Sequence, residues 1–75
     1  MSNIEKLALI GQALYGQSWK SEMAKSLGYD YRRIQHWMTG SRPMPDDIWP
    51  KIKILVEQRQ DELAKIKALL LGLFS

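Results

Sequence analysis

Cysteine is absent from the 75-residue sequence, and histidine occurs once, at His36. Without thiols the chain forms neither disulfide bonds nor thiolate metal sites. One imidazole does not supply the cluster of ligands that a metal site requires. We therefore expect no bound metal and no cofactor. A chain this short must gain its stability from tight helix packing or from association with a second chain.

Long apolar runs are also absent. The longest, residues 68–74, is far shorter than the roughly 20 residues that span a bilayer. The first five residues, MSNIE, lack the basic flank and the apolar run of a signal peptide. These two features predict a cytoplasmic protein that does not interact with membranes.

No combination of residues typical of an enzyme is present. The sequence has no glycine-rich phosphate loop after a strand, no nucleophile paired with a base and no spacing of metal ligands. We interpret Asp30, Asp46 and Asp47 as helix caps rather than catalytic carboxylates. His36 has no acidic partner at a fixed spacing. The sequence therefore predicts neither an enzyme nor a site for a small-molecule ligand.

Positive charge is concentrated in the first part of the chain. Residues 1–44 carry six basic and three acidic side chains, a net charge of +3, whereas residues 45–75 carry five of each. An excess of positive charge favours contact with a polyanion. The first part is therefore a candidate surface for such a partner, and the balanced C-terminal part is expected to have another role.

Apolar residues at helical spacing, separated by cap and stop residues, predict an all-α fold of about four helices. The predicted caps are Ser2 with Glu5 as a capping box, Ser18 and Asp30, and the predicted stops are Gly16, Gly28 and Gly40. The second helix is expected to run from Trp19 to Leu27, and the third from Tyr31 to about Met38.

A long fourth helix is predicted after a loop at residues 40–45, which contains two prolines and a glycine. Asp46 or Asp47 is expected to cap it, and Pro50 falls in its first turn, where a missing amide costs nothing. No helix breaker occurs at residues 52–71, so this helix has about 25 residues and a length of about 37 Å. Because a small core cannot cover it, we expect it either to bend near residues 58–60 or to pack its second half against another chain.

The stretch Lys20 to Thr39 has the spacing of two helices that cross through a short turn. Ala24 is small where the third helix passes over the second, and Gly28 supplies a backbone angle that other residues resist. The side chains expected to fill the space between the helices are Leu27, Ile34 and Trp37. This spacing predicts a helix-turn-helix motif.

The opposite face of the helix that begins at Tyr31 is polar. It carries Tyr31, Arg32, Gln35 and His36, with Arg33 at its edge. Arginine can bind guanine, and glutamine adenine, with two hydrogen bonds each, and the major groove of DNA is wide enough for one helix. We therefore predict that Tyr31, Arg32, Gln35 and His36 contact bases and that Arg33 contacts the DNA backbone.

The set Ala24, Gly28, Ile34 and Trp37, followed by Gly40-Ser41-Arg42-Pro43, resembles the Cro and phage-repressor type of helix-turn-helix regulator. The run from Trp37 to Pro45 is similar to that of small phage and bacterial repressors, including anti-CRISPR-associated regulators. The resemblance covers about two-thirds of the chain. It implies a small domain of lambda-repressor type in a bacterial or phage-encoded, nucleoid-associated protein.

The same resemblance implies that a dimer binds an inverted-repeat operator in double-stranded DNA, usually to repress transcription. Tyr31, Arg32 and His36 match base-reading positions in that family, and Lys20, Ser41 and Arg42 match positions that touch phosphates. The sequence departs from the family at Lys20, where glutamine is common. It also departs after Asp47, where one long helix replaces two short ones.

The long helix carries an apolar repeat of 3.5 residues, which is the seam of two helices packed lengthwise. We predict that Leu63, Ile66, Leu69, Leu70 and Leu73 form the interface of a homodimer. The chain then divides into residues 1–45, a DNA-binding part with its motif at 20–39, and residues 46–75, which serve the core and dimerisation.

Two other functions remain open at the level of sequence. The same fold can serve as a protein-interaction or adaptor module without DNA binding, with the long helix as the partner surface. The lack of acidic residues at positions 31–45 argues against this alternative. An RNA-binding regulator is the third possibility, but Tyr31 is the only aromatic residue on the polar face that is available to stack on bases.

Overall fold

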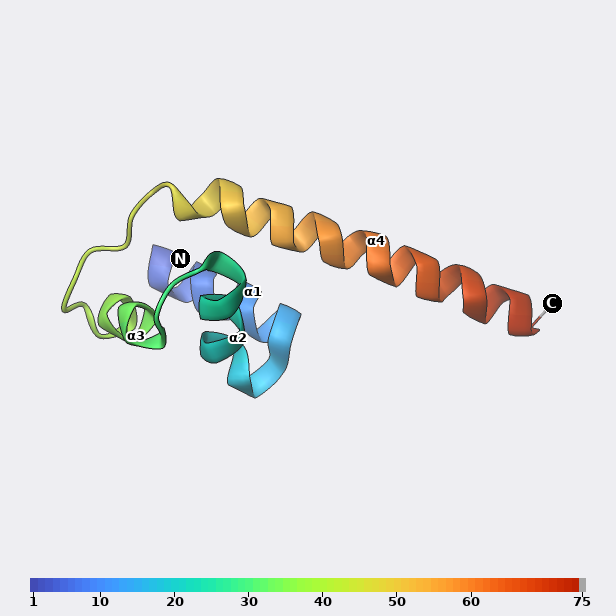
Figure 1. The fold of residues 1–75 in the computed structure, drawn as a ribbon, viewed down its shortest axis with the longest axis horizontal. Coiled ribbons are helices and arrows are strands. Elements are labelled where there is room, and N and C mark those ends of the chain that lie inside the picture. Colours follow the sequence, from blue (N-terminus) through green and yellow to red (C-terminus); the bar gives the residue numbers. More distant parts are fainter. Residues whose placement is uncertain (75) are drawn as a thin grey trace.

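The computed structural model describes residues 1–74, and this part of the chain is all-helical (Figure 1). Its elements are α1 (Asn3–Tyr15), the 3₁₀ turn η1 (Gly16–Ser18), α2 (Trp19–Leu27), α3 (Tyr31–Thr39) and α4 (Ile48–Phe74). The all-α class and the long C-terminal helix are therefore confirmed. In Figure 1 the first three helices gather beneath the N-terminal half of α4, and the C-terminal half extends away from them.

The helix ends follow the capping chemistry of the sequence. The Glu5 amide donates to the Ser2 hydroxyl at 3.1 Å, and the Ser2 amide donates to the Glu5 carboxylate at 3.3 Å, which completes the predicted capping box. At the start of α3, the Asp30 carboxylate accepts a hydrogen bond of 3.0 Å from the amide of Arg32. Gly28 ends α2 with a φ of 78°, a conformation that side chains with a Cβ resist.

Ser18 does not cap α2 in the predicted way. It stands at the N-cap position, but its side chain makes no capping hydrogen bond. The reason is local, because η1 runs directly into α2 and holds Ser18 at a ψ of 23°, away from the extended conformation that a capping side chain needs. The serine therefore marks the start of the helix without bonding to its first turn.

The core lies where α1, α2, α3 and the start of α4 meet. Its buried side chains are Leu7, Leu14, Trp19, Met23, Ala24, Ile34, Trp37, Ile48 and Ile52. Trp37 is thus a core residue, as the sequence predicts. Trp19 is buried in the same core, and Trp49 packs partly buried against it. The N-terminal half of α4 packs chiefly on α2.

Gly11 allows α1 to approach Trp19 closely. A Cβ atom at Gly11 would overlap the six-membered ring of Trp19, and this ring is almost completely buried. The glycine therefore stands in the apolar stripe of α1 because the indole occupies the space of its missing side chain. This contact fixes the position of the start of α2 against α1.

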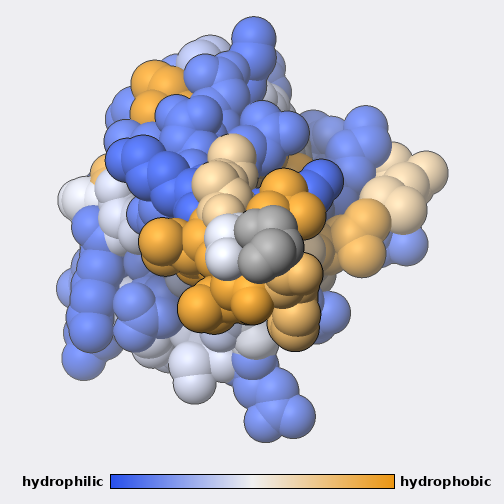
Figure 2. Space-filling view, turned by 90° about the vertical axis from the view of Figure 1, so that its right-hand side faces the viewer, coloured by the Kyte–Doolittle hydropathy of each residue, from blue (hydrophilic) through white to orange (hydrophobic). Residues whose placement is uncertain are grey.

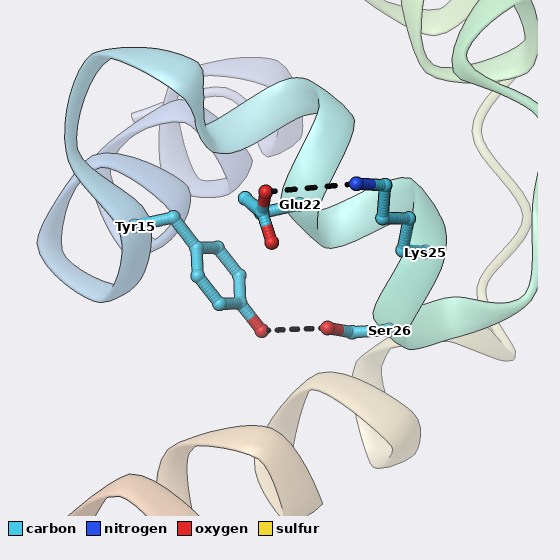
Figure 3. Close-up of polar contacts among 4 residues, drawn as sticks. All are labelled: Tyr15, Glu22, Lys25 and Ser26. Atoms are coloured by element: carbon cyan, nitrogen blue, oxygen red, sulfur yellow. Dashed lines mark hydrogen bonds and ion pairs between the residues drawn. The ribbon is translucent and has the colours of Figure 1, made fainter.

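Tyr15 joins three helices on the side of α2 shown in Figure 3. Its hydroxyl lies 2.9 Å from the hydroxyl of Ser26 in α2, next to the exposed ion pair of Glu22 and Lys25 (Figure 3). The guanidinium of Arg59 in α4 lies 5.9 Å from the centre of the Tyr15 ring. Arg59 interrupts the apolar repeat of α4, and this contact shows that it belongs to the globular part of the molecule.

Helix α4 continues through residues 58–60 without interruption, and in Figure 1 it runs in one general direction along its whole length. Every residue from 60 to 74 is exposed, and we call this segment the C-terminal overhang. Among residues 1–74, no helix combines the length and apolar character needed to cross a membrane. The overhang nevertheless carries exposed leucines and isoleucine, which Figure 2 shows gathered around the C-terminal end.

Candidate nucleic-acid interface

The turn between α2 and α3 holds the two helices in a fixed arrangement. The amide of Tyr29 donates a hydrogen bond of 2.8 Å to the carbonyl of Ala24, and Gly28 supplies the left-handed residue that the turn needs. Ile34 and Trp37 face α2 from α3 and are buried. The rings of Tyr29 and Trp37 pack in a T-shaped arrangement at a centroid distance of 5.4 Å and an interplanar angle of 84°. The buried side of α3 is therefore fully occupied.

The outer face of α3 carries the predicted base-reading residues. Tyr31, Arg32 and His36 are exposed, and so is Arg33 at the edge of this face. Asp30 is the acidic residue at the start of the helix, and one of its carboxylate oxygens is bonded to the helix amide of Arg32. The face thus presents donors and positive charge, as recognition of DNA requires.

Gln35 differs from the other predicted base readers. It is partly buried, and its side-chain carbonyl accepts a hydrogen bond of 3.1 Å from the ammonium group of Lys20 at the start of α2. From the sequence, Lys20 is expected at a phosphate and Gln35 at a base, with no contact between them. In the structure the two side chains form one unit that bridges α2 and α3.

Three arginines line two adjoining hollows beside α3. The larger, of about 470 Å³, is lined by Arg33, Trp37, Arg42, Pro43 and Pro45. The smaller, of about 190 Å³, is lined by Asp30, Arg32, Arg33, His36 and Arg42. Because Arg33 and Arg42 border both hollows, the loop after α3 brings Arg42 to the polar face of the helix. Arginine is suited to phosphate, since its planar group donates two parallel hydrogen bonds.

A further hollow, of about 300 Å³, lies on the other side of Tyr31 and is lined by Gln17, Ser18, Lys20, Ser21 and Tyr31. Here Lys20 stands in the first turn of α2, where the helix dipole favours an anion. Lys20 and Arg42 therefore lie on opposite sides of the α3 face. These two of the four predicted phosphate contacts therefore flank the predicted base contacts.

The loop after α3 is held by short-range hydrogen bonds. The hydroxyls of Thr39 and Ser41 are 3.0 Å apart, and the Arg42 amide donates to the His36 carbonyl at 3.2 Å. Ser41 is exposed directly after α3. The loop is therefore fixed to the end of the helix, and Arg42 is held near it.

Lys51 is a cation at this site that the sequence analysis did not single out. It comes from α4, and its ammonium group lies 5.3 Å from the centre of the Tyr29 ring and 3.5 Å from its hydroxyl. Arg33 lies 5.3 Å from the centre of the same ring. No spacing in the sequence links Lys51 to the turn, since only the packing of α4 on α2 brings them together.

The part of the chain that the structure describes holds no group of three or more acidic, histidine or cysteine side chains placed to bind a metal ion. Comparisons with protein-family models, with curated proteins and with solved structures find no match.

Proposed function

We propose that this protein is a sequence-specific DNA-binding regulator with a helix-turn-helix domain of lambda-repressor type. Its recognition helix is α3, which enters the major groove. Tyr31, Arg32 and His36 read bases there, and Gln35 does so from its contact with Lys20. Lys20, Arg33, Ser41 and Arg42 bind the phosphates on either side. As a dimer on an inverted repeat, the protein acts as a repressor.

One observation carries this proposal. The exposed side of α3 presents Arg32, Arg33 and His36, and the loop adds Arg42, while the acidic side chain among them, Asp30, caps the helix. A solvated helix face normally mixes charges of both signs. A face whose one neighbouring carboxylate caps the helix, on a helix whose other side is packed, suits the negative potential of a DNA groove.

The exposed apolar overhang favours a second candidate function, that of an adaptor that binds other proteins through α4. In that case the polar face of α3 has no ligand. The two functions differ in one measurement, because only the DNA-binding regulator selects particular sequences from a random pool.

Selection of binding sites from random double-stranded DNA, followed by gel-shift titration of the selected site, tests the proposal. We expect one recurring sequence with affinity at least ~10³-fold above random DNA at physiological salt. Enrichment of no sequence, with equal weak binding to all fragments, would contradict it. A matched single-stranded RNA pool distinguishes an RNA-binding regulator.

A further inference from the structure

The C-terminal overhang continues the face of α4 that is buried in the globular part. Eighteen residues make five full helical turns. Ile66, Leu70 and Leu73 therefore point in the same direction as Ile48, Ile52 and Leu55, which lie eighteen residues earlier. Ile48 and Ile52 are buried under the first three helices. The same stripe is about half exposed at Ile66 and Leu70 and 77% exposed at Leu73.

We infer that the overhangs of two copies pair antiparallel, so that each apolar stripe covers the other and the dimer has widely separated recognition helices. The spacing of the stripe supports this arrangement. Leu63, Ile66, Leu70 and Leu73 are separated by three, four and three residues. This order reads the same in both directions, so Leu63 meets the partner's Leu73 while Ile66 meets the partner's Leu70. The two-fold axis then passes near Ala68.

The area of the stripe is sufficient for a second copy. Phe74 extends it and is 85% exposed, which gives five large apolar side chains on each chain. With on the order of 100 Å² buried by each, the two chains together bury about 1,000 Å². This area is near the lower limit for a specific interface, so a weak to moderate dimer is expected. The overhang is also neutral, because Asp61 and Glu62 balance Lys65 and Lys67.

A parallel pair on the same stripe is blocked by the globular part. Helices α1 and α2 lie against that stripe from Ile48 to Val56. In a parallel pair, the N-terminal halves of both α4 helices run side by side, and two globular parts must fit between them. Packed helices have axes about 8–10 Å apart, which leaves no room for these parts. In the antiparallel pair each overhang instead ends beside the partner's globular part.

Surface charge alone favours the parallel pair, whereas steric exclusion favours the antiparallel pair. Because the two effects predict different orientations, they can be tested against each other. In a parallel pair, Glu62 faces the partner's Lys67, five residues further along. In the antiparallel pair, the two copies of Lys67 lie on the same edge near the axis. Exposed ion pairs contribute little compared with the loss of a whole apolar seam. Steric exclusion therefore decides the orientation, and Lys67 weakens the dimer that forms.

The orientation also sets the geometry on DNA, and this step rests on the proposed function. Ile48 lies twenty residues before the axis at Ala68, or about 30 Å along α4, so the starts of the two α4 helices are about 60 Å apart. Helix α3 lies beside that end in Figure 1, and Lys51 near it contacts Tyr29 at the start of the turn to α3. Half-sites spaced by one turn of DNA, about 34 Å, are too close together for this separation, and half-sites spaced by two turns, about 68 Å, fit it better.

Sedimentation equilibrium and cysteine cross-linking test the pairing without DNA. The chain has no cysteine of its own, so introduced thiols report only on the chosen positions. A mixture of L63C and L73C chains should form a disulfide between the two variants, and each variant alone should form little. Disulfide formation by each variant alone would show the parallel pair. A wild-type mass of 8.7 kDa at tens of micromolar would show that no pair forms.

Three variants of the overhang complete the test. The double variant Ile66→Asp, Leu70→Asp should be monomeric, whereas Leu71→Asp, which places the same charge off the stripe, should remain a dimer. If the double variant and Leu71→Asp weaken the dimer equally, the proposed apolar seam is wrong. Lys67→Gln should tighten the antiparallel dimer about two- to fivefold, and weakening would indicate the parallel pair. Circular dichroism confirms that each variant keeps its helices.

Inverted half-sites spaced by one or two helical turns test the consequence for DNA. We expect tighter binding when the half-site centres are about 20 base pairs apart. Preference for about 10 base pairs would overturn the antiparallel arrangement while supporting DNA binding. Loss of all DNA binding, with the cross-links intact, would contradict the proposed function and leave the dimer standing.

Discussion

The ammonium group of Lys20 and the side-chain carbonyl of Gln35 form a hydrogen bond of 3.1 Å between the start of α2 and the outer part of α3. Free glutamine side chains lose rotamer freedom when they bind a base, and this contact restricts Gln35 in advance. The lysine keeps two further donors for a phosphate. The residue proposed to contact the DNA backbone therefore also positions a residue proposed to read a base.

We predict that Lys20 and Gln35 act as a pair in DNA binding. Lys20→Ala should weaken binding to all sequences, and Gln35→Ala should weaken mainly the selected operator. In a double-mutant cycle of gel-shift affinities, the two effects should differ from additivity by about 0.5–1.5 kcal/mol, because each variant removes the same hydrogen bond. Additive effects would show that the two residues act independently on DNA.

Arg32 is expected to give the largest single contribution to sequence preference. It lies in the first turn of α3, where side chains reach deepest into the groove. Arg32→Ala should cost ~1–3 kcal/mol on the best operator and relax the preference at one base pair. His36→Ala should cost less, since an imidazole makes a single hydrogen bond to a base. The control for the loss of one positive charge is Lys53→Ala, at an exposed position of α4. If this variant loses as much operator affinity as Arg32→Ala, base reading by Arg32 is contradicted.

Arg42 is expected to bind phosphate. It borders both hollows beside α3 and lies on the loop after the helix. Arg42→Ala should therefore weaken operator and random DNA to a similar extent and reduce the slope of log K against log salt by about one. Titrations between 50 and 200 mM salt measure this slope, using ~ten-point series at fixed pH. A slope equal to that of the wild type would remove Arg42 from the interface.

Gly11 is expected to be essential for the stability of the globular part. Gly11→Ala inserts a methyl group into the space of the Trp19 ring, and overpacking of this kind costs about 1–3 kcal/mol. Urea unfolding monitored by tryptophan fluorescence measures the loss. Gly72→Ala is the matched control, because a Cβ there meets no atom within 4 Å, and it should stabilise the helix by up to ~1 kcal/mol. Equal stability of the two variants would contradict the close approach of α1 to Trp19.

The elements of the fold follow from local chemistry that the sequence displays. Ser2 with Glu5 and Asp30 start helices through short-range hydrogen bonds, and Gly28 ends one through its backbone freedom. These interactions involve residues within a few positions of one another, so their spacing predicts them. Ser18 shows the limit of this reasoning, because a 3₁₀ turn that the sequence analysis did not include changed its backbone conformation.

The sequence also predicts which side chains of α3 form its exposed face. Ile34 and Trp37 are apolar and three residues apart, so they define the buried side and leave Tyr31, Arg32 and His36 outside. Because the helical repeat is regular, the spacing of apolar and polar residues along the sequence shows which side chains point to the same side of the helix. For this reason the candidate base readers could be chosen before any tertiary contact was known.

The sequence by itself determined the helices, their caps and the directions of their side chains, because these depend on neighbours within one or two turns. Tertiary packing decided which distant side chains meet. Lys20 reaches Gln35 fifteen residues away, and Lys51 reaches Tyr29 twenty-two residues away, through helix crossings that no periodicity encodes. The same packing decided which stretch of the apolar stripe on α4 is covered, because the short helices α1 and α2 end before the overhang begins.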